Sequence, residues 1–461
     1  MSFLLTLVIF GILIVVHEFG HFIAARHSGV RVEKFSIGFG PPLFKFKGKE
    51  TEFLVCIFPL GGYVKLAGDN RSESEGKPDE FLSKSPGIRG KIVFAGVFFN
   101  YLFALIIFWL IALIGFPYQD TVIGGAFSDY PAHESGLEEG DRIVAVNGKE
   151  ITGWRELERK IHKSQGEVSL SVERGDQIIS VLTSLKQEEI TDEFGRKVTV
   201  SMLGVFPYRN TTIGNLLEKY PAKEAGLKQG DKIVAVGGVY VDSWKEMAEL
   251  IHKTKDKVSL TIEREGEIIS VVTDVKKDEI TNSDGKKELV SLIGIGPYAE
   301  VQFKRYPFFK AFLKGTETLF GLTADILKGF SAIITGTISF KEGAAGPIGI
   351  FYITSEYIKV GFVAVLQLMA ALNISLAIIN LFPIPVLDGG HILFLFIEKL
   401  RGKPASDKVE DFATRVGLTL LGILFVFITY NDIVRFGSET WSNISNGSVQ
   451  VWNKLQGKTS E

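Results

Sequence analysis

Two histidines and a glutamate stand together near the start of the chain, in His17-Glu18-Phe19-Gly20-His21. Residues four apart share one face of a helix, so both imidazoles would point at one place. Such a pair suits two ligands of a tetrahedral zinc ion, and Glu18 suits a general base for the water bound to it. The pattern also occurs by chance, so its surroundings decide its meaning.

The histidine pair lies inside an apolar stretch, residues 3–25. As a helix this stretch would reach roughly 34 Å, enough to cross the hydrocarbon core. A signal peptide has a similar apolar core, but no positive residue comes before this one, and apolar residues resume after His21. We therefore expect an uncleaved first span. Ionisable residues inside a span are costly and indicate a functional site.

A zinc hydrolase needs a third protein ligand and an open position for water. Asp388 is the candidate, because it follows Asn380-Leu381-Phe382-Pro383-Ile384-Pro385, whose prolines should unwind a helix at membrane depth. Capping of the next helix is the alternative role for Asp388, and His391 is the alternative third ligand. Two imidazoles and a carboxylate favour zinc over another divalent ion.

Three further segments, 91–117, 361–382 and 412–433, are apolar enough to span a membrane. The segment 26–91 is rich in Lys and Arg, and the short segment between the last two spans carries Lys399, Arg401, Lys403 and Lys408. By the positive-inside rule both segments are cytoplasmic, and both termini and the long central region lie outside. His17 would then lie nearer the cytoplasmic face.

Composition narrows the class of protein. The 461 residues are 46% hydrophobic and 23% charged, which fits apolar spans mixed with ordinary globular sequence. A net charge of −2 argues against nucleic acid as a partner. A single cysteine, Cys56, excludes an intramolecular disulfide framework and a cysteine-rich zinc module.

The central region is an internal duplication. Tyr130-Pro131-Ala132 recurs as Tyr220-Pro221-Ala222, and the later Gly-Asp turn and Ile-Val-Ala-Val run recur at the same offset. Each copy has alternating β-branched runs and one amphipathic helix, which predicts two tandem α+β domains.

Each copy resembles a circularly permuted bacterial PDZ domain, on the basis of its Gly-Leu-x-x-Gly-Asp turn and the strand after it. PDZ domains add an extended peptide to a sheet edge. The resemblance places the loops that cap a peptide carboxylate near Ile123 and Gly124, and near Ile213 and Gly214. The alternative is that the domains bind no peptide and act as steric bulk.

Two more segments belong to the membrane region. Residues 306–330 carry one apolar stripe that is too interrupted to span, so they should lie on the outer interface or pack on the bundle. Residues 31–66 contain β-rich runs and glycine-proline stretches, which predict a hairpin beside the first span.

The HExxH span, the Asn-x-x-Pro-x-Pro run and the Leu-Asp-Gly triplet together resemble the site-2 protease family of intramembrane zinc proteases. Two PDZ domains between the second and third spans resemble its Gram-negative branch. The resemblance implies one zinc ion per chain on His17, His21 and Asp388, with Glu18 as base. It implies that Asn380 holds the substrate backbone or the oxyanion, although a buried Asn could equally cap the broken helix. It also implies that the hairpin pairs with an unwound substrate.

The expected architecture is a polytopic α-helical membrane protein with about four transmembrane helices and a membrane-associated β hairpin, plus two tandem periplasmic α+β PDZ domains. Its regions are 1–118 with the HExxH helix, 119–208 and 209–298 as the PDZ domains, and 299–461 with the last two spans. The resemblance implies the bacterial inner membrane and, as substrate, a single-pass anti-sigma factor already trimmed outside, with the PDZ pair as a size filter. The rival functions are a non-hydrolytic PDZ scaffold and a metal-ion carrier.

Overall fold

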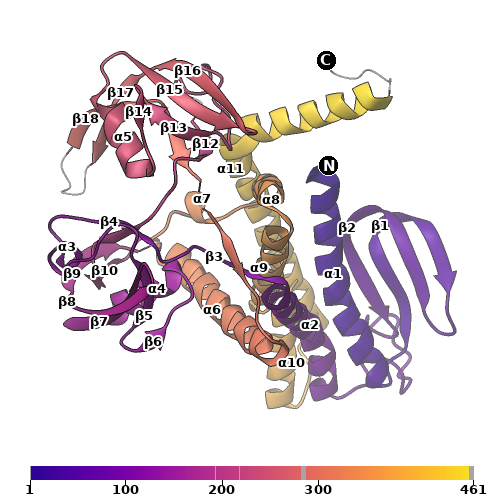
Figure 1. Cartoon of the computed structure of the whole chain (residues 1–461). Coiled ribbons are helices and arrows are strands. Elements are labelled where there is room, and N and C mark those ends of the chain that lie inside the picture. The colour runs from indigo at the N-terminus through magenta and orange to yellow at the C-terminus, as the bar shows by residue number, and fades with distance from the viewer. Residues whose placement is uncertain (1, 193, 218, 282–286, 299, 456–461) are drawn as a thin grey trace. The chain divides into compact units, whose positions relative to one another are not determined.

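The computed structural model describes residues 2–192, 194–217, 219–281, 287–298 and 300–455 (Figure 1). It divides into two compact units: a membrane unit of Met1–Gly115 with Arg305–Glu461, and a PDZ unit of Phe116–Lys304. Residue 299, where the last region was expected to begin, and residues 456–461 lie outside the described part of the chain.

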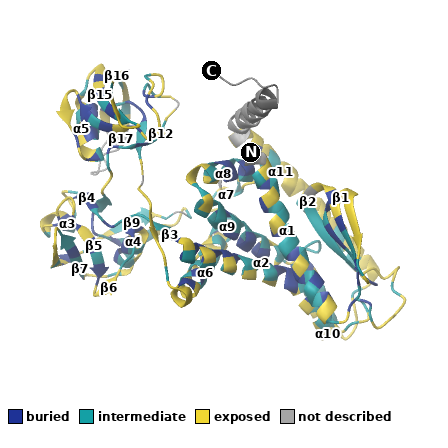
Figure 2. Cartoon of the chain, turned by 45° about the vertical axis from the view of Figure 1, so that its right-hand side comes forward, coloured by how far each residue is buried: buried dark blue, intermediate teal, exposed yellow. Residues whose placement is uncertain are grey.

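Four helices of the membrane unit are long and apolar enough to cross a bilayer. They are α1 (Ser2–His27), α2 (Pro86–Ile114), α9 (Phe362–Asn380) and the first part of α11 (Asp407–Leu455). The chain is a multi-pass membrane protein, and the predicted fold class is confirmed. In the most apolar stretch of each helix, 39% is buried in α2 and only 6% in α11. α2 is therefore the central helix of the bundle (Figure 2).

Small residues let α1 and α2 approach closely. A Cβ atom at Gly20 would overlap the carbonyl oxygen of Ala95 and lie 3.0 Å from Cα of Gly96. Close backbone contact through glycine and alanine is how membrane helices associate where no hydrophobic driving force exists. The contact lies between His17 and His21 in sequence, so it presses this face of α1 against α2.

A long hairpin, β1 (Val32–Lys47) and β2 (Glu52–Leu66), leans on the end of α1 that follows the histidines. Phe22 of α1 contacts Phe35 and Phe53 of the hairpin with ring centroids 5.4 and 5.9 Å apart. Further along β1, Phe44 and Phe46 are about 70% exposed, with 73% and 69% of their surface accessible. An exposed aromatic strand of this kind suits lipid rather than water.

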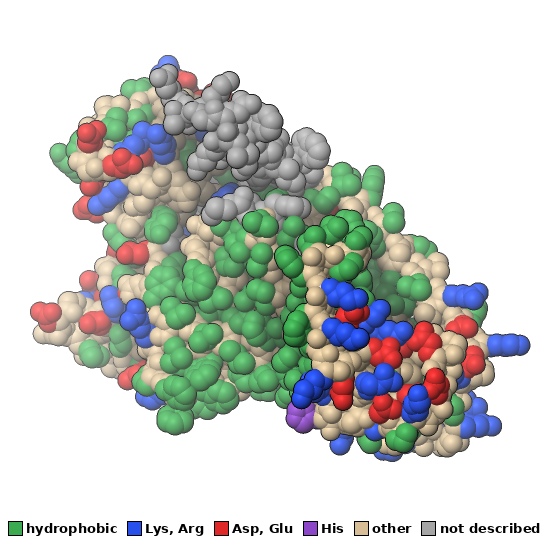
Figure 3. All heavy atoms as spheres, turned by 90° about the vertical axis from the view of Figure 1, so that its right-hand side faces the viewer, with side chains coloured by type: hydrophobic (Ala, Val, Ile, Leu, Met, Phe, Trp, Pro, Cys, Tyr) green, Lys and Arg blue, Asp and Glu red, His purple; other side chains and the backbone are tan. Residues whose placement is uncertain are grey.

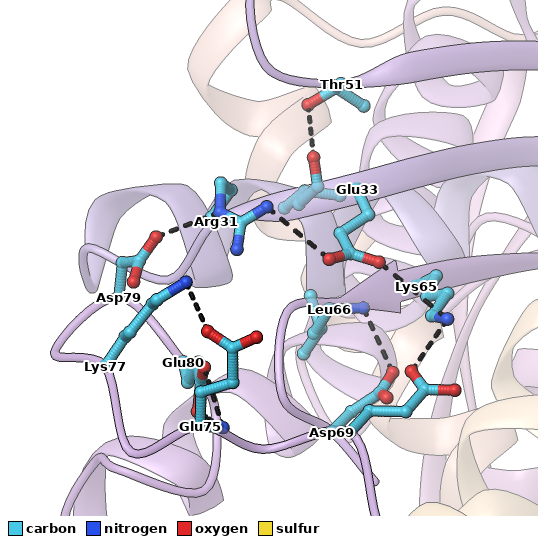
Figure 4. Close-up of polar contacts among 12 residues, drawn as sticks. Arg31, Glu33, Thr51, Lys65, Leu66, Asp69, Glu75, Lys77, Asp79 and Glu80 are labelled. Carbon is cyan, nitrogen blue, oxygen red and sulfur yellow. Dashed lines mark hydrogen bonds and ion pairs between the residues drawn. The ribbon is translucent and has the colours of Figure 1, made fainter.

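The base of the hairpin is held by polar contacts (Figure 4). The Arg31 side chain donates from Nε to Asp79 at 2.9 Å, and its backbone N–H donates to the Asp79 carbonyl at the same distance. At the other strand, the Leu66 N–H donates to the Asp69 carboxylate at 3.1 Å. These bonds fix both strands to the loop that leads into α2, and so fix the hairpin relative to α1 and α2.

The amphipathic segment forms α6 (Phe308–Ile334), which packs on the bundle. Trp109 of α2 donates its indole N–H to the Phe308 carbonyl at 3.2 Å. A Cβ at Gly315 would lie 2.9 Å from the backbone nitrogen of Trp109. The opposite face carries exposed apolar residues such as Phe309, which is 80% accessible. The helix therefore packs on α2 mainly through small residues such as Ala311 and Gly315, while large apolar residues of the predicted stripe such as Phe309 stay exposed.

The remaining helices of the membrane unit are short: α7 (Phe340–Gly343), α8 (Pro347–Val360) and α10 (Asp388–Arg401). Asp432 of α11 is fully buried and accepts from the N–H groups of Gly346 and Gly349 at 3.1 and 2.8 Å. These are the free donors at the start of α8. The otherwise peripheral α11 is thus attached to the bundle through α8. Figure 3 shows the broad apolar surface of one face, with charged side chains gathered beside it.

The PDZ unit holds two α+β domains with matching sheets, which confirms the duplication. The first has β4 (Ile123–Ala126), α3 (Pro131–Glu134), β5 (Arg142–Val146), β6 (Lys149–Glu150), α4 (Trp154–Lys163), β7 (Glu167–Arg174), β8 (Gln177–Ser184), β9 (Lys186–Thr191), β10 (Lys197–Met202) and β11 (Val205–Pro207). The second has β12 (Ile213–Leu216), β13 (Lys232–Val236), β14 (Val239–Tyr240), α5 (Trp244–Lys253), β15 (Lys257–Arg264), β16 (Glu267–Asp274), β17 (Lys276–Thr281), β18 (Lys287–Leu292) and β19 (Ile295–Pro297).

The four-stranded sheets run β6-β5-β7-β8 and β14-β13-β15-β16. Outside them, β4 pairs with β11 and β12 pairs with β19. The first and last strands of the unit, β3 (Phe116–Tyr118) and β20 (Gln302–Lys304), pair with each other in antiparallel register. The chain therefore leaves and re-enters the membrane unit at neighbouring points.

A buried carboxylate stabilises each PDZ domain. Asp141, 1% exposed, accepts a bidentate pair from Arg174 at 2.7 Å on each oxygen, together with the Glu138 N–H at 2.9 Å. Burial opposes ionisation, but the bonds from Arg174 and Glu138 outweigh it, so the pKa of Asp141 lies below its usual value. Asp231 and Arg264 repeat the arrangement in the second copy.

We predict that Asp141→Asn destabilises the first PDZ domain by about 2 kcal/mol at pH 7, because charge-assisted hydrogen bonds to a buried carboxylate are lost. A carboxylate with a lowered folded pKa stabilises above its unfolded pKa of about 3.9 and loses that contribution as pH falls through its folded pKa. The stability gap between wild type and variant should therefore begin to narrow below roughly pH 4 and close only below the folded pKa of Asp141. Hydrogen exchange of the full chain, resolved by domain, measures the difference.

The exposed Asp176 supplies a control, since Asp176→Asn should leave the exchange of the same domain unchanged. A stability gap between wild type and Asp141→Asn that stays constant down to pH 3 would contradict the role given to this ion pair.

Candidate metal centre and active site

The two histidines of α1 face the same point. Their Nε2 atoms lie 3.2 Å apart, and the rings meet edge to face at 87°. His17 is 9% exposed, so the pair is shielded from solvent by the surrounding helices. The helical spacing expected from the sequence thus brings two nitrogen ligands to one place.

Asp388 completes the group from the far end of the chain. Its Oδ2 lies 3.3 Å from His17 Nε2 and 3.5 Å from His21 Nε2, and one ligand atom from each residue falls within 4.8 Å of the others. The N-cap of α10 is Leu387, and Asp388 follows it as the first helical residue. Within the described residues, Asp388 Oδ2 has no hydrogen-bond partner. That oxygen is directed at the histidines rather than used as a cap.

The three atoms fit a zinc ion. Ligands about 2.0–2.2 Å from a tetrahedral zinc lie roughly 3.3–3.6 Å from one another. The observed separations of 3.2, 3.3 and 3.5 Å form one face of such a tetrahedron. Asp388 Oδ2 is buried and receives no hydrogen bond within the described residues, and it faces two imidazole nitrogens. These three atoms together are a set of ligand atoms that suits a cation. The fourth corner remains for water.

A backbone carbonyl sets the protonation of His21. Its Nδ1 lies 2.9 Å from the carbonyl oxygen of Ile92 in α2, which can only accept a hydrogen bond. The neutral ring therefore carries its proton on Nδ1, and Nε2 keeps a lone pair for a metal. α2 thus takes part in the site although it supplies no ligand to it.

Close backbone packing places Asp388 at this depth. α9 ends at Asn380, and the chain turns through the two prolines before α10 begins. Cβ atoms at Gly389 and Gly390 would overlap the carbonyl groups of Leu381 and Ile384. Only glycine allows the first turn of α10 to fold back against the break, which holds the carboxylate near α1.

Glu18 lies beside the hairpin. A Cβ on Gly62 of β2 would be 3.4 Å from Cγ of Glu18. The strand β2 therefore passes directly along the side of α1 that carries the predicted base.

Asn380, at the last position of α9, has Nδ2 3.5 Å from His17 Nε2, so its amide borders the ligand cluster. His391 is not a member of that cluster among the described residues, and its side chain is exposed.

The predicted peptide-binding loops lie in strands β4 and β12. The side chains of Ile123 and Ile213 are fully buried in the two domain cores. The N–H of Ile123 donates to the Asp141 carbonyl at 2.7 Å, and its own carbonyl accepts from Gly140 at 2.8 Å. A Cβ at Gly124 would lie 2.7 Å from the Pro207 carbonyl oxygen, and Gly214 meets Pro297 in the same way. These residues contribute to the packing of their domains.

Sequence reasoning missed two residues of α2. Asn100 is fully buried, with Nδ2 3.3 Å from His17 Nδ1. A Cβ at Gly96 would lie 2.7 Å from His17 Cε1 and would overlap the His21 ring. A polar residue in the middle of an apolar span is itself a functional signal, and Asn100 could have been found by that rule. Nothing in the sequence marks Gly96.

Proteins of known family resemble this chain over most of its length. The model of the family named peptidase family M50 matches residues 5–424. This chain belongs to peptidase family M50. Protease RseP of Yersinia pestis is 35% identical over 446 residues, covering 93% of this chain and 97% of its own.

Regulator of sigma-E protease RseP of Escherichia coli K12 is 35% identical over 450 residues, with 93% of this chain and 97% of that protein covered. A putative zinc metalloprotease of Neisseria meningitidis is 33% identical, covering 93% and 98%. These matches confirm the family predicted from the motifs. The M50 chain is an intramembrane zinc metalloprotease.

Two solved PDZ domains, from the SdrC-like proteins of Listeria monocytogenes and Listeria innocua, are similar at 21% and 22% identity. Each covers 20% of this chain, and they cover 88% and 96% of their own chains, with TM-scores of 0.16.

We predict that Gly96→Ala weakens zinc binding by about a hundredfold. The added methyl group would overlap both imidazoles and push them away from the point on which they converge. Gly90→Ala is the matched control, since it lies in the same helix and its Cβ would meet nothing within 4 Å. Zinc affinity of the purified variants, measured by chelator competition, checks this. Equal affinities would show that the histidines are not held against α2 as described.

Proposed function

We propose that His17, His21 and Asp388 hold one zinc ion, at which Glu18 and Asn380 cleave a peptide bond in the transmembrane segment of a single-pass protein. The observation that carries this proposal is the buried triangle of two imidazole nitrogens and an unpartnered carboxylate oxygen, with sides of 3.2, 3.3 and 3.5 Å. Intramembrane ionisable residues that converge in this way mark a reaction site.

Each side chain has a task in the hydrolysis. Bound zinc lowers the pKa of water towards about 7 and polarises the scissile carbonyl. Glu18, next to the first ligand, accepts the proton of the attacking water and passes it to the leaving amine. The amide of Asn380 is a neutral hydrogen-bond donor at the edge of the cluster, suited to a developing oxyanion or to the substrate backbone.

A transmembrane substrate must be unwound, because a helix hides its amides in its own hydrogen bonds. At the break between α9 and α10 the chain is not helical, which leaves room beside the ligands for an extended substrate. The strand β2 passes Glu18 at Gly62, which places an extended backbone beside the base. We infer that the substrate lies extended between β2 and the break, where a strand can offer backbone hydrogen bonds.

Orientation follows from charge. The hairpin loop and the loop before α11 are rich in Lys and Arg, and such loops remain cytoplasmic. The termini and the PDZ unit are then periplasmic, in the inner membrane of a Gram-negative cell. His17 lies just past the middle of the span Leu4–His27, on its cytoplasmic side in this orientation, so we infer that cleavage releases a cytoplasmic fragment.

The relatives named for the regulation of sigma E suggest the substrate. We infer that it is an anti-sigma factor in an envelope stress response, already trimmed on the periplasmic side. The two PDZ domains would exclude untrimmed ectodomains by size. Peptide capture at Gly124 and Gly214 would depend on their main chains, because the neighbouring isoleucine side chains are buried in the cores.

The two rival functions account for less. A scaffold has no use for a base beside two metal ligands. A metal carrier leaves the PDZ unit and the strand beside Glu18 unexplained, and it would require further ligands along a path. Membership of a peptidase family favours hydrolysis over both.

We predict that Glu18→Gln lowers the cleavage rate by about 10²–10⁴-fold, the usual worth of a general base, while zinc content stays near one ion per chain. His17→Ala should lose both zinc and cleavage. Purified proteins, a reporter with one transmembrane segment and elemental analysis measure these outcomes. A Glu18→Gln enzyme that cleaves at the wild-type rate would exclude the mechanism and favour the scaffold.

We predict that removal of residues 116–304 allows cleavage of a substrate with a folded ectodomain. Because β3 and β20 pair with each other, Gly115 and Arg305 can be joined by a short linker. The shortened enzyme should cleave trimmed and untrimmed reporters alike, whereas wild type should cleave the trimmed reporter alone. Glu18→Gln in the shortened chain controls for other proteases. Continued rejection of the untrimmed reporter by an otherwise active enzyme would refute the size filter.

A further inference from the structure

One buried amide next to the metal centre has no task in the mechanism above. Asn100 lies in the middle of α2, is fully buried, and has Nδ2 3.3 Å from His17 Nδ1. Its Oδ1 has no hydrogen-bond partner within the described residues. An amide in an apolar span is costly unless it is paired, so a leucine would serve better if only packing mattered.

A hydrogen-bond requirement of His17 explains why an amide lies at this position. To offer Nε2 to a metal, a neutral imidazole must carry its proton on Nδ1. That Nδ1–H then requires an acceptor, since the surroundings are dry. For His21 the acceptor is the Ile92 carbonyl at 2.9 Å, an atom that can only accept. At the Nδ1 of His17 the contact is the amide of Asn100.

An amide can meet this need in one of its two orientations. Rotation by half a turn about the last side-chain bond exchanges N and O and leaves the outline of the group unchanged. With Nδ2 towards His17, the ring would have to carry its proton on Nε2, where the ligand lone pair must be. With Oδ1 towards it, the unpartnered oxygen gains a donor and Nε2 is freed. The second orientation agrees with the position of Asp388 and His21 around Nε2.

We propose that Asn100 is a positioning residue that accepts a hydrogen bond from the Nδ1–H of His17 and thereby fixes the tautomer in which Nε2 binds zinc. This inference rests on the proposed ligand role of His17. It gives α2 a defined part in the centre: two acceptors on one helix, the Ile92 carbonyl and the Asn100 amide, set the proton positions of both histidines. Partners of this kind behind metal ligands are worth about ten- to a hundredfold in metal affinity.

The test compares five full-length proteins by zinc affinity, measured with a chromophoric chelator in detergent: wild type, Asn100→Leu, Asn100→Asp, Asn373→Leu and His17→Ala. Leucine keeps the branched outline of Asn100, is somewhat larger, and removes its acceptor, so affinity should fall about ten- to a hundredfold. Aspartate keeps an acceptor and cannot donate, so Asn100→Asp should retain wild-type affinity or exceed it. Thermal unfolding of the zinc-free proteins shows whether each variant folds.

Asn373 is the matched control. It is fully buried in the spanning helix α9, donates Nδ2 to the Met369 carbonyl at 2.9 Å, and also has an unpartnered Oδ1 among the described residues. Asn373→Leu therefore removes a similar amide from a similar environment away from the ligands. Its zinc affinity should equal that of wild type.

Two outcomes would overturn the proposal. One is wild-type zinc affinity in Asn100→Leu, which would show that the amide does not support His17. The other is a loss in Asn100→Asp as large as that in Asn100→Leu, since a donor role or packing alone would produce it. If Asn100→Leu fails to fold, the aspartate variant alone decides. Failure of the ligand assignment is distinguishable, because wild type and His17→Ala would then bind zinc equally.

Discussion

The fold of the membrane unit depends on one constraint: two imidazoles and a carboxylate lie in an apolar environment, where unpaired polar groups are costly. A bilayer offers no water to satisfy them, so their partners must come from the protein or from a bound metal. The Nε2 atoms of the two histidines and Oδ2 of Asp388 lie next to one another. The Nδ1 atoms of the histidines contact the Ile92 carbonyl and the Asn100 amide. In the proposed centre the charge of a zinc ion would satisfy this costly group, so metal binding and local order should depend on each other.

Segments far apart in sequence must be placed to within a few tenths of an ångström for this to work, and α2 provides the common reference. It touches α1 through Gly20 and Gly96, and it lies against α9 and α10, which carry Asn380 and Asp388. Near the other end of α10, Arg89 of α2 forms a buried ion pair with Glu398. Such a pair stabilises little by itself, but it specifies which positions of two helices meet.

The sequence carries the periodic and chemical parts of this structure well. Apolar length predicts the four spans, the His17–His21 spacing predicts that two imidazoles meet, and the two prolines locate the break before Asp388. The sequence does not predict features that depend on how closely two helices approach each other. Gly96 matters only because its missing Cβ leaves room for two rings of another helix. The stripe of α6 fits a lipid surface and a helix surface equally well, and the structure divides them: α6 packs on α2 beside Trp109, while Phe309 and Phe320 stay exposed.

In the mechanism proposed above, the break between α9 and α10 would link metal binding to substrate recognition. The same turn that ends α9 at Asn380 starts α10 at Asp388, so one irregular segment carries both the amide that borders the cluster and the third ligand. Gly389 and Gly390 allow this turn to pack tightly, because a Cβ atom at either position would overlap the backbone between Leu381 and Pro385. Any movement that repositions Asn380 towards a substrate must therefore move the Asp388 carboxylate as well. An enzyme built in this way gains a reason to hold its histidines firmly from behind: with one ligand on a segment that also contacts substrate, the α1 ligands and their supports on α2 must define the centre.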